Sequence, residues 1–280
     1  MSTDAEPTYT TEEGSHTVKD GTKLYTKTWT LSFGRGWGRS VTTQASKGLT
    51  GGSPLIYEDL ASFISTHLPS PVPIFLMGHS MGGGIVLGFA ADGPQEQIQQ
   101  FRGLLAESPF LALAPASQAS RITVVLGRLA GKLLPHHQMV QKLNPAFLSR
   151  DPEVNKINDE DPLCHDTGTL EGLAAMLDRG ECIVKGSTVP PATLPIWISH
   201  GSADKITGYD ASRKWTEQTA LSKDKEFKSY EGWYHKLHGE PGEDKYTYAK
   251  DTADWILARA GSTTATAGKA TEGEDGRAKL

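Results

Sequence analysis

Apolar residues along the chain fall into short runs that alternate with helical patterns. Four runs predict strands buried in a sheet: 73–77, 103–106, 195–199 and 227–230. Apolar residues at helical spacing predict helices at 55–67, 81–91, 209–220 and 244–260. Strands that alternate with helices in this way predict an α/β fold whose sheet is mostly parallel and flanked by helices.

One long stretch breaks this alternation. Residues 111–190 carry helical patterns and turn signals but no convincing buried strand, which predicts a helical insertion above the sheet. The core is therefore expected in two parts, an N-terminal part at 15–110 and a C-terminal part at 191–260. The first part opens with a predicted β-hairpin over 15–29, where Asp20-Gly21 supplies the turn.

The two ends of the chain have a different composition. Residues 1–14 are polar and acidic, and residues 261–280 are Gly, Ser, Thr, Ala and charged residues with only one large apolar side chain, Leu280. We expect a disordered lead-in and a disordered tail, since neither segment can bury enough apolar surface to fold. The first residues also lack the apolar region of a secretory signal, so a cytoplasmic protein is expected.

Charge and hydropathy narrow the classes of partner. The chain of 280 residues has 28 basic and 33 acidic side chains, which gives a formal net charge of −5. A mildly acidic chain is a poor partner for nucleic acid, which needs concentrated Lys and Arg. No run reaches the roughly 18–20 apolar residues of a membrane-spanning helix. Without HExxH, Cys/His zinc spacing or a phosphate-binding G-x-x-x-x-G-K motif, neither metal nor nucleotide cofactor is predicted.

A glycine-rich motif supplies the first chemical signal. Gly78-His79-Ser80-Met81-Gly82-Gly83 directly follows the run at 73–77 and precedes a helix. It matches G-x-S-x-G, in which small residues two positions either side let a serine sit on a tight strand-to-helix turn. The turn places the Ser80 hydroxyl above the sheet edge and at a helix N-terminus, where developing negative charge is favoured. Ser80 is therefore the candidate nucleophile, with a chance match as the competing explanation.

The serine needs a general base and a group that orients the base. In this strand–turn–helix context the acid and then the histidine follow the serine along the chain. Asp204 lies in the loop after the run at 195–199, so we expect it at the same sheet edge as Ser80. Asp210 and Glu217 are weaker candidates because they lie on the following helix.

The candidate base is His235, which follows the run at 227–230. His238 is its rival in the same loop. The other histidines singled out are expected to be structural or solvent-exposed: His79, His136, His137 and the strand-ending His200.

Three motifs together resemble the monoacylglycerol lipase family of α/β-hydrolases, a group also described as serine aminopeptidase-like or lysophospholipase-like. They are Gly78–Gly83, His200–Asp204 and Tyr234–His238. Arg35-Gly36-Trp37-Gly38-Arg39-Ser40 resembles the R-G-x-G-x-S loop of that family, and the similarity runs from about Gly14 to Arg259 with one interruption. The resemblance implies an α/β-hydrolase fold, a helical lid over 111–190, and hydrolysis of a monoacylglycerol ester without a cofactor.

The family pattern also implies roles for the site residues. His235 would take the proton of Ser80 and return it to the departing glycerol, while Asp204 holds His235 in the productive tautomer. The backbone N–H of Met81 would bind the oxyanion. The implied partner is a lipid ester substrate.

The chain departs from the family between the hairpin and Arg35. Family members have a strand ending in a His-Gly oxyanion motif, a helix and a further strand there, whereas only Thr30-Leu31-Ser32-Phe33-Gly34 lie in this interval. A strand–helix–strand unit needs ~30 residues, so the N-terminal part of the sheet is predicted to be incomplete. One oxyanion donor would be lost, and the hypothesis is a truncated or mis-spliced lipase that folds poorly or acts weakly.

The insertion contains one strongly amphipathic segment. Its apolar stripe comprises Ile122, Val125, Leu126, Leu129 and Leu133, with Arg121, Arg128 and Lys132 on the flank. One interpretation is a helix packed on the hydrolase body. The other is a lid helix that touches a membrane or lipid-droplet surface and admits an acyl chain.

Three functions follow from these observations. The first is a serine hydrolase that cleaves a monoacylglycerol or similar lipid ester through an acyl-enzyme. The second is a catalytically silent hydrolase-fold protein, favoured by the missing oxyanion strand. The third retains catalysis but acts on a lysophospholipid or a peptide N-terminus.

Overall fold

The computed structural model describes residues 9–17, 23–31, 35–117 and 121–261. Side chains are described for 35–117 and 127–261. The tail expected at 261–280 lies outside the described residues apart from Gly261, and so do residues 1–8 of the expected lead-in.

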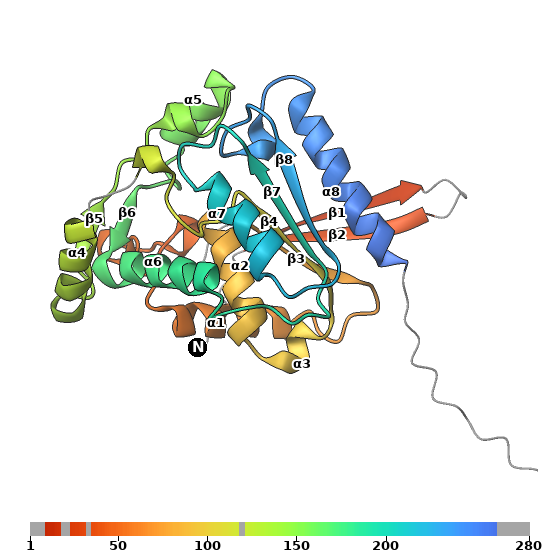
Figure 1. Cartoon of the computed structure of the whole chain (residues 1–280), viewed down its shortest axis with the longest axis horizontal. Coiled ribbons are helices and arrows are strands. Elements are labelled where there is room, and N and C mark those ends of the chain that lie inside the picture. Colours follow the sequence, from red (N-terminus) through yellow and green to blue (C-terminus); the bar gives the residue numbers. More distant parts are fainter. Residues whose placement is uncertain (1–8, 18–22, 32–34, 118–120, 262–280) are drawn as a thin grey trace, which may run out of the picture.

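A four-stranded parallel sheet forms the centre of the molecule (Figure 1). Its strands are β3 (Ile74–His79), β4 (Phe101–Glu107), β7 (Ile196–Gly201) and β8 (Lys225–Tyr230), in the spatial order β3-β4-β7-β8. All three pairings are parallel, so the carboxyl ends of the strands meet at one edge. The four predicted strands and the mostly parallel sheet are confirmed.

Helices cover both faces of this sheet. Their bounds are α1 (Ser53–Ser65), α2 (Met81–Asp92), α3 (Gln95–Ile98), α6 (Leu170–Lys185), α7 (Tyr209–Lys214) with a π-helical turn (Trp215–Thr219), and α8 (Asp244–Ala260). Short 3₁₀ turns occur at Gly38–Ser40, Gln44–Ser46, Pro115–Ser117, Pro145–Phe147 and Leu237–Gly239. The predicted helix at 244–260 has the observed bounds, and the one at 209–220 changes to π-helical geometry from Trp215.

Alternating side chains along the strands build two separate cores. Leu104 and Ala106 of β4 pack with side chains from α1, α2 and α6, whereas Leu105 points to the other face and packs with Trp197 and with Trp255 of α8. This alternation is the period of two that a strand imposes on its side chains.

The outer strand β3 is less covered than its neighbours. Met77, Leu105 and Trp197 lie side by side on one face in register, yet Met77 is 43% exposed while Leu105 and Trp197 are at most 1% exposed. Within the described residues β3 pairs on one side only, with β4. This agrees with the predicted gap in the N-terminal part of the sheet, because a missing neighbour leaves both the edge and the face beside Met77 uncovered.

The N-terminal hairpin is longer than its sequence pattern indicates. Strands β1 (Tyr9–Thr17) and β2 (Lys23–Leu31) pair antiparallel, with Tyr9 opposite Leu31. Residues 9–14, expected in a disordered lead-in, therefore belong to β1, since polar Thr and Glu residues are held by the backbone ladder rather than by an apolar pattern. The predicted Asp20-Gly21 turn lies outside the described residues.

The insertion at 111–190 is helical with a small β-sheet. It contains α4 (Arg121–Leu133), β5 (Gln138–Val140), α5 (Pro152–Glu160), β6 (Thr167–Thr169) and α6. Figure 1 shows α4, β5 and β6 grouped at one end of the molecule. The antiparallel pair β5–β6 adds two short strands that the sequence pattern does not indicate, because three-residue strands are too short to show a period-two pattern.

The loop at 35–40 ties the body to this insertion. Trp37 stacks on His165, with ring centroids 4.2 Å apart, and His165 Nε2 lies 3.1 Å from the carbonyl oxygen of Gly36. Gly36 has a φ of 80°, and a Cβ there would lie 2.6 Å from the Leu49 nitrogen, so only glycine fits.

Among the described helices, none combines the length and apolarity needed to cross a bilayer.

Candidate active site

Ser80 occupies a strained turn between β3 and α2. Its φ of 56° and ψ of −120° are unusual for a residue with a side chain, and its N–H donates to the Glu107 carbonyl oxygen at 2.9 Å. A Cβ on Gly78 would lie 2.3 Å from the Gly82 carbonyl oxygen, and one on Gly83 would lie 2.8 Å from Pro109 Cα. The tight turn therefore requires Gly78 and Gly83.

Gly82 does not play the steric part assigned to it by the motif. A Cβ built on Gly82 meets nothing within 4 Å. The expectation of a small residue on both sides of Ser80 holds at Gly78 and is wrong at Gly82. Gly82 is the second residue of α2, the helix that follows the outer strand β3, and within the described residues β3 has no paired strand on its far side.

Asp204 and His235 meet as the sequence predicts. Asp204 lies in the loop after β7 and His235 in the loop after β8, and His235 Nδ1 is 2.8 Å from Asp204 Oδ2. Both side chains are buried, at 2% exposure or less. Because a carboxylate only accepts, His235 donates Nδ1–H, which leaves Nε2 as the basic nitrogen.

Asp204 is held as an anion by several donors. The N–H groups of Ile206 and Thr207 donate to Oδ1 at 2.7 and 3.1 Å, and Thr207 Oγ1 and His200 Nε2 lie 2.8 and 3.1 Å from Oδ2. Burial alone raises the pKa of Asp204, but the hydrogen bonds from His200 and His235 outweigh it and hold the pKa well below its ordinary value. Asp204 is thus ionised at neutral pH.

His79 links the Ser80 turn to the His235 loop. Its Nε2–H donates to the His235 carbonyl oxygen at 3.2 Å, and the two ring centroids are 4.7 Å apart. Burial lowers the pKa of His79 to about 3, so its ring is neutral. In the described part of the chain no hydrogen bond joins Ser80 Oγ to His235; such bonds are often long in unliganded enzymes.

The oxyanion donor expected from Met81 has the right backbone context. Met81 is the first residue of α2, and the first N–H groups of a helix have no partner within the helix. Ser80, as the N-cap, contributes no side-chain hydrogen bond to this terminus. The Met81 N–H is therefore available to an anion beside Ser80.

A second histidine–carboxylate pair, missed by the sequence analysis, stands beside the first. His238 Nδ1 is 2.8 Å from both Glu107 carboxylate oxygens, and the His238 N–H donates to Oε1 at 3.2 Å. Burial alone raises the pKa of Glu107, but electrostatic interaction with His79 and His238 and the hydrogen bonds from His238 lower it to about 2. The signal in the sequence is a carboxylate at the end of a run of apolar strand residues.

The loop that carries His235 is anchored on both sides of it. The Tyr234 N–H donates to Glu240 Oε1 at 2.6 Å, and the fully buried Glu240 also accepts from Arg150 Nε at 2.8 Å. The Lys236 N–H donates to the Leu148 carbonyl oxygen at 2.7 Å. These contacts fix the backbone around the base, since buried charge-assisted hydrogen bonds are strong.

The remaining candidates lie outside the site. Asp210 is 86% exposed and paired with Arg213, and Glu217 is exposed on the π-helical turn. His136 and His137 are exposed, as expected. His238, the rival base, is hydrogen-bonded to Glu107. His200 is fully buried and contacts Asp204, so its structural role is the one of the two expected alternatives that the structure shows.

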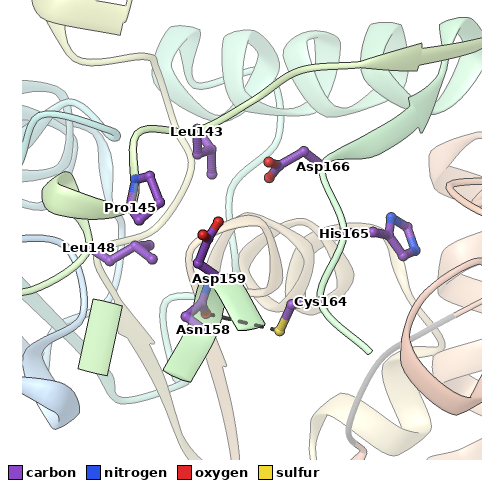
Figure 2. A pocket seen from close by; sticks show the side chains of 8 residues that line it. All are labelled: Leu143, Pro145, Leu148, Asn158, Asp159, Cys164, His165 and Asp166. Atoms are coloured by element: carbon purple, nitrogen blue, oxygen red, sulfur yellow. Dashed lines mark hydrogen bonds between the residues drawn. The ribbon is translucent and has the colours of Figure 1, made fainter. Parts of the chain in front are cut away.

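A small cavity in the insertion lies apart from Ser80. It has a volume of about 70 Å³ and is lined by Leu143, Pro145, Leu148, Asn158, Asp159, Cys164, His165 and Asp166 (Figure 2). Its polar wall does not suit an acyl chain. Across the described residues no group of three or more His, Cys, Asp or Glu side chains is arranged to hold a metal ion.

Known proteins resemble this chain in sequence and fold. A putative monoglyceride lipase of Schizosaccharomyces pombe is 33% identical over 223 residues, which cover 79% of this chain and 58% of that protein. A soluble variant of Saccharomyces cerevisiae monoglyceride lipase, solved with a substrate analog, superimposes with a TM-score of 0.73 at 23% identity, covering 85% of this chain and 78% of that one.

A monoacylglycerol lipase of Paleococcus ferrophilus gives a TM-score of 0.67 at 26% identity, covering 85% of this chain and 84% of that one. The match to the S. pombe protein covers 58% of that protein, so the chain spans little more than half of its length. The family model for serine aminopeptidase, S33, matches residues 34–242, which include Ser80, Asp204 and His235. The chain belongs to this family of α/β-hydrolases, among relatives that include monoglyceride lipases.

Proposed function

We propose that the chain is a serine hydrolase that cleaves a monoacylglycerol or similar lipid ester through an acyl-enzyme. The observation that carries the proposal is the buried Asp204–His235 pair at 2.8 Å, held next to the strained turn of Ser80. An ionised acid behind a neutral imidazole is the arrangement that activates a serine hydroxyl. The family membership and the monoglyceride lipase relatives support the same class of substrate.

The proposed reaction proceeds in two steps. His235 Nε2 takes the Ser80 proton as Oγ bonds to the ester carbonyl carbon, and the Met81 N–H stabilises the oxyanion. The bond from the carbonyl carbon to the glycerol oxygen then breaks, and His235 returns its proton to that oxygen. A water molecule, deprotonated by His235, then attacks the acyl carbon. The bond from this carbon to Ser80 Oγ breaks, His235 returns the proton to Oγ, and the fatty acid is released.

A catalytically weak or silent hydrolase-fold protein is the second candidate. The observation that favours it is the uncovered outer side of β3 in the described residues, marked by the exposed Met77. The family supplies a second oxyanion donor from a segment on that side of the nucleophile strand, and loss of one such donor costs ~10²–10³ in kcat.

A lipid surface is the proposed location of the substrate. Leu129 and Leu133 on α4 are 53% and 83% exposed, so the described end of the apolar stripe does not pack on the body. Arg128 binds Asp178 and Glu181 of α6 at 2.6 and 2.8 Å, which fixes this helix with its leucines outward. An apolar helix face presented to solvent suits peripheral contact with a membrane or lipid droplet.

Labelling by a fluorophosphonate probe tests the nucleophile. Wild-type protein should form an adduct on Ser80, whereas Ser80→Ala should not. Ser62→Ala, which removes an exposed hydroxyl on α1, is the matched control and should label normally. Adduct formation on any other serine, or none on wild-type protein that retains its circular dichroism spectrum, would refute the proposal and favour the silent alternative.

Substrate turnover tests the class of ester. We expect release of glycerol from a monoacylglycerol to exceed turnover of a lysophospholipid, and an aminoacyl anilide to be inert. Faster cleavage of the lysophospholipid or the anilide would assign the third function, a hydrolase of a different substrate, in place of the lipase.

A further inference from the structure

One oxygen of the proposed catalytic acid is shared by two imidazole rings. Asp204 Oδ2 lies 2.8 Å from His235 Nδ1 and 3.1 Å from His200 Nε2. His200 comes from the end of β7 and is fully buried. A second imidazole bound directly to the acid of a Ser–His–Asp system is not needed for the proton transfers themselves.

The surroundings of His200 determine its protonation. Because the carboxylate only accepts, His200 donates through Nε2–H. Its Nδ1 is buried and has no hydrogen-bond partner within the described structure. A second proton there would leave a buried, charged N–H without an acceptor, which is strongly unfavourable. The pocket therefore holds His200 as a neutral ring with its proton on Nε2.

We propose that His200 is a positioning residue that limits the basicity of His235 by sharing Asp204 Oδ2. Each donor on a carboxylate oxygen takes part of its negative charge, so the His200 hydrogen bond weakens the pull of Asp204 on a proton at His235. The same bond fixes Oδ2 in the direction of His235 Nδ1. The inference rests on the proposed function, because it concerns the base that activates Ser80.

His200 acts through Asp204 and not through the substrate. Its ring is fully buried and packs edge-on against Tyr209, with centroids 5.8 Å apart. The other titratable groups near the pair are His79 from β3, Glu107 from β4 and His238 from the loop after β8. Thr207 Oγ1 also lies 2.8 Å from Asp204 Oδ2, 3.2 Å from His235 Nδ1 and 3.3 Å from His200 Nε2. A change at His200 leaves all of these groups in place, so two His200 variants that differ only in retaining an N–H donor isolate the His200 hydrogen bond.

Two substitutions of His200 distinguish the effect of its N–H donor from the effect of its side-chain volume. His200→Leu removes the donor, whereas His200→Gln retains an N–H that can reach Oδ2. ¹⁵N NMR of the His235 ring over a range of pH should show protonation displaced to higher pH in the leucine variant and unchanged in the glutamine variant. The acidic limb of the kcat/KM–pH profile should move by the same amount, with KM on the plateau unaffected. Tyr209→Phe, which keeps the ring contact, is the control and should titrate as wild type.

Several results would overturn the inference. An unshifted or lowered His235 titration in folded His200→Leu protein would do so, as would equal shifts in the leucine and glutamine variants. If the leucine variant does not fold, His200→Met removes the donor with a more adaptable side chain. In the wild-type chain alone, ¹⁵N shifts should identify His200 as the neutral Nε2–H tautomer between pH 6 and 8, and a charged ring would exclude the role.

The NMR titration needs no substrate, so the two proposals fail separately. A chain that turns over no ester yet shows the donor-dependent shift at His235 would refute the lipase function and retain the role of His200. A chain that hydrolyses monoacylglycerol without that shift would do the reverse.

Discussion

The two sides of the proposed active site differ in how deeply their strands are buried. On the acid–base side every residue of β7 is buried, and Asp204 is surrounded by donors from its own loop and from His200. On the nucleophile side no residue of β3 is fully buried, and Met77 is 43% exposed where its neighbour Leu105 is fully covered. Asp204 thus follows a strand that is buried between two neighbours, whereas Ser80 follows a strand at the edge of the sheet.

This difference shows which parts of a hydrolase depend on each other. The side-chain hydrogen bonds of Asp204 and His235 come from the end of β7 and from the loops after β7 and β8. Ser80 depends instead on the glycines of its turn and on the Glu107 carbonyl oxygen. The Asp204–His235 pair is therefore assembled from the C-terminal part of the sheet, whereas the Ser80 turn lies on a strand that pairs only with β4 in the described residues.

The largest effect is expected on kcat, from a substitution of Asp204 on the acid–base side. In Asp204→Asn the amide oxygen can still accept from the Ile206 and Thr207 N–H groups, but the amide nitrogen then faces the donors of His235 and His200. Because His235 is held in the wrong tautomer, kcat should fall ~10⁴-fold. Steady-state ester hydrolysis measures this. Asp210→Asn, on the exposed side chain of α7, is the matched control, and a loss there as large as at Asp204 would contradict the assignment.

The next largest effect is on the free energy of unfolding, and it compares Leu105 with Met77, its neighbour on the same face of the sheet. Leu105→Ala should lower the free energy of unfolding by about 2–5 kcal/mol, because it opens a cavity in a closed core. Met77→Ala, next to it on the exposed strand, should cost less than about 1 kcal/mol. Urea denaturation measures both. Equal losses would mean that β3 is covered in solution, for example by self-association, and sedimentation would then show it.

His79, at the boundary between the two sides, gives a pH dependence. Its folded pKa of about 3 lies below the ordinary value of 6.5, so protons bind the unfolded chain more readily between these values. Stability is therefore complete above pH 6.5 and falls as pH drops towards 3, with a slope that approaches about 1.4 kcal/mol per pH unit. His79→Gln should flatten the slope between pH 6.5 and 4.5, the window above the titration of Glu107. An unchanged slope would show that His79 titrates normally.

The smallest effect concerns the lipid surface. Leu129→Ser and Leu133→Ser together should weaken liposome binding, by roughly 1–2 kcal/mol for each leucine that inserts, without lowering stability. Leu221→Ser, which removes a 63% exposed leucine far from α4 in the sequence, should leave binding unchanged. Vesicle flotation provides the measurement, and equal binding by all three proteins would assign α4 a purely structural role.

The sequence predicts the acid–base pair because strand order and loop position suffice to bring Asp204 and His235 to one edge. It does not predict that His200 and Glu107 bind the site, since their partners lie 4 and 131 residues away and are chosen by side-chain direction. The short interval between the predicted hairpin and Arg35 follows from counting residues in the sequence. The length of the hairpin and the β5–β6 pair could not be predicted from the sequence. Backbone hydrogen bonds stabilise these polar or very short strands, so they need no apolar pattern.

The pairing of β3 on one side only predicts that the Ser80 turn is disrupted by heat before the whole fold melts. A strand with one hydrogen-bonded neighbour separates from a sheet at a lower free energy than a strand between two, and its amide protons exchange with solvent sooner. Within the described sheet β3 and β8 each pair on one side only, so the strands next to Ser80 and His235 should open at a lower free energy than β7, which lies between two neighbours and precedes Asp204. Thermal inactivation should precede the melting of β7 and α8, so that a chain with its folded signature largely intact has already lost its nucleophile geometry.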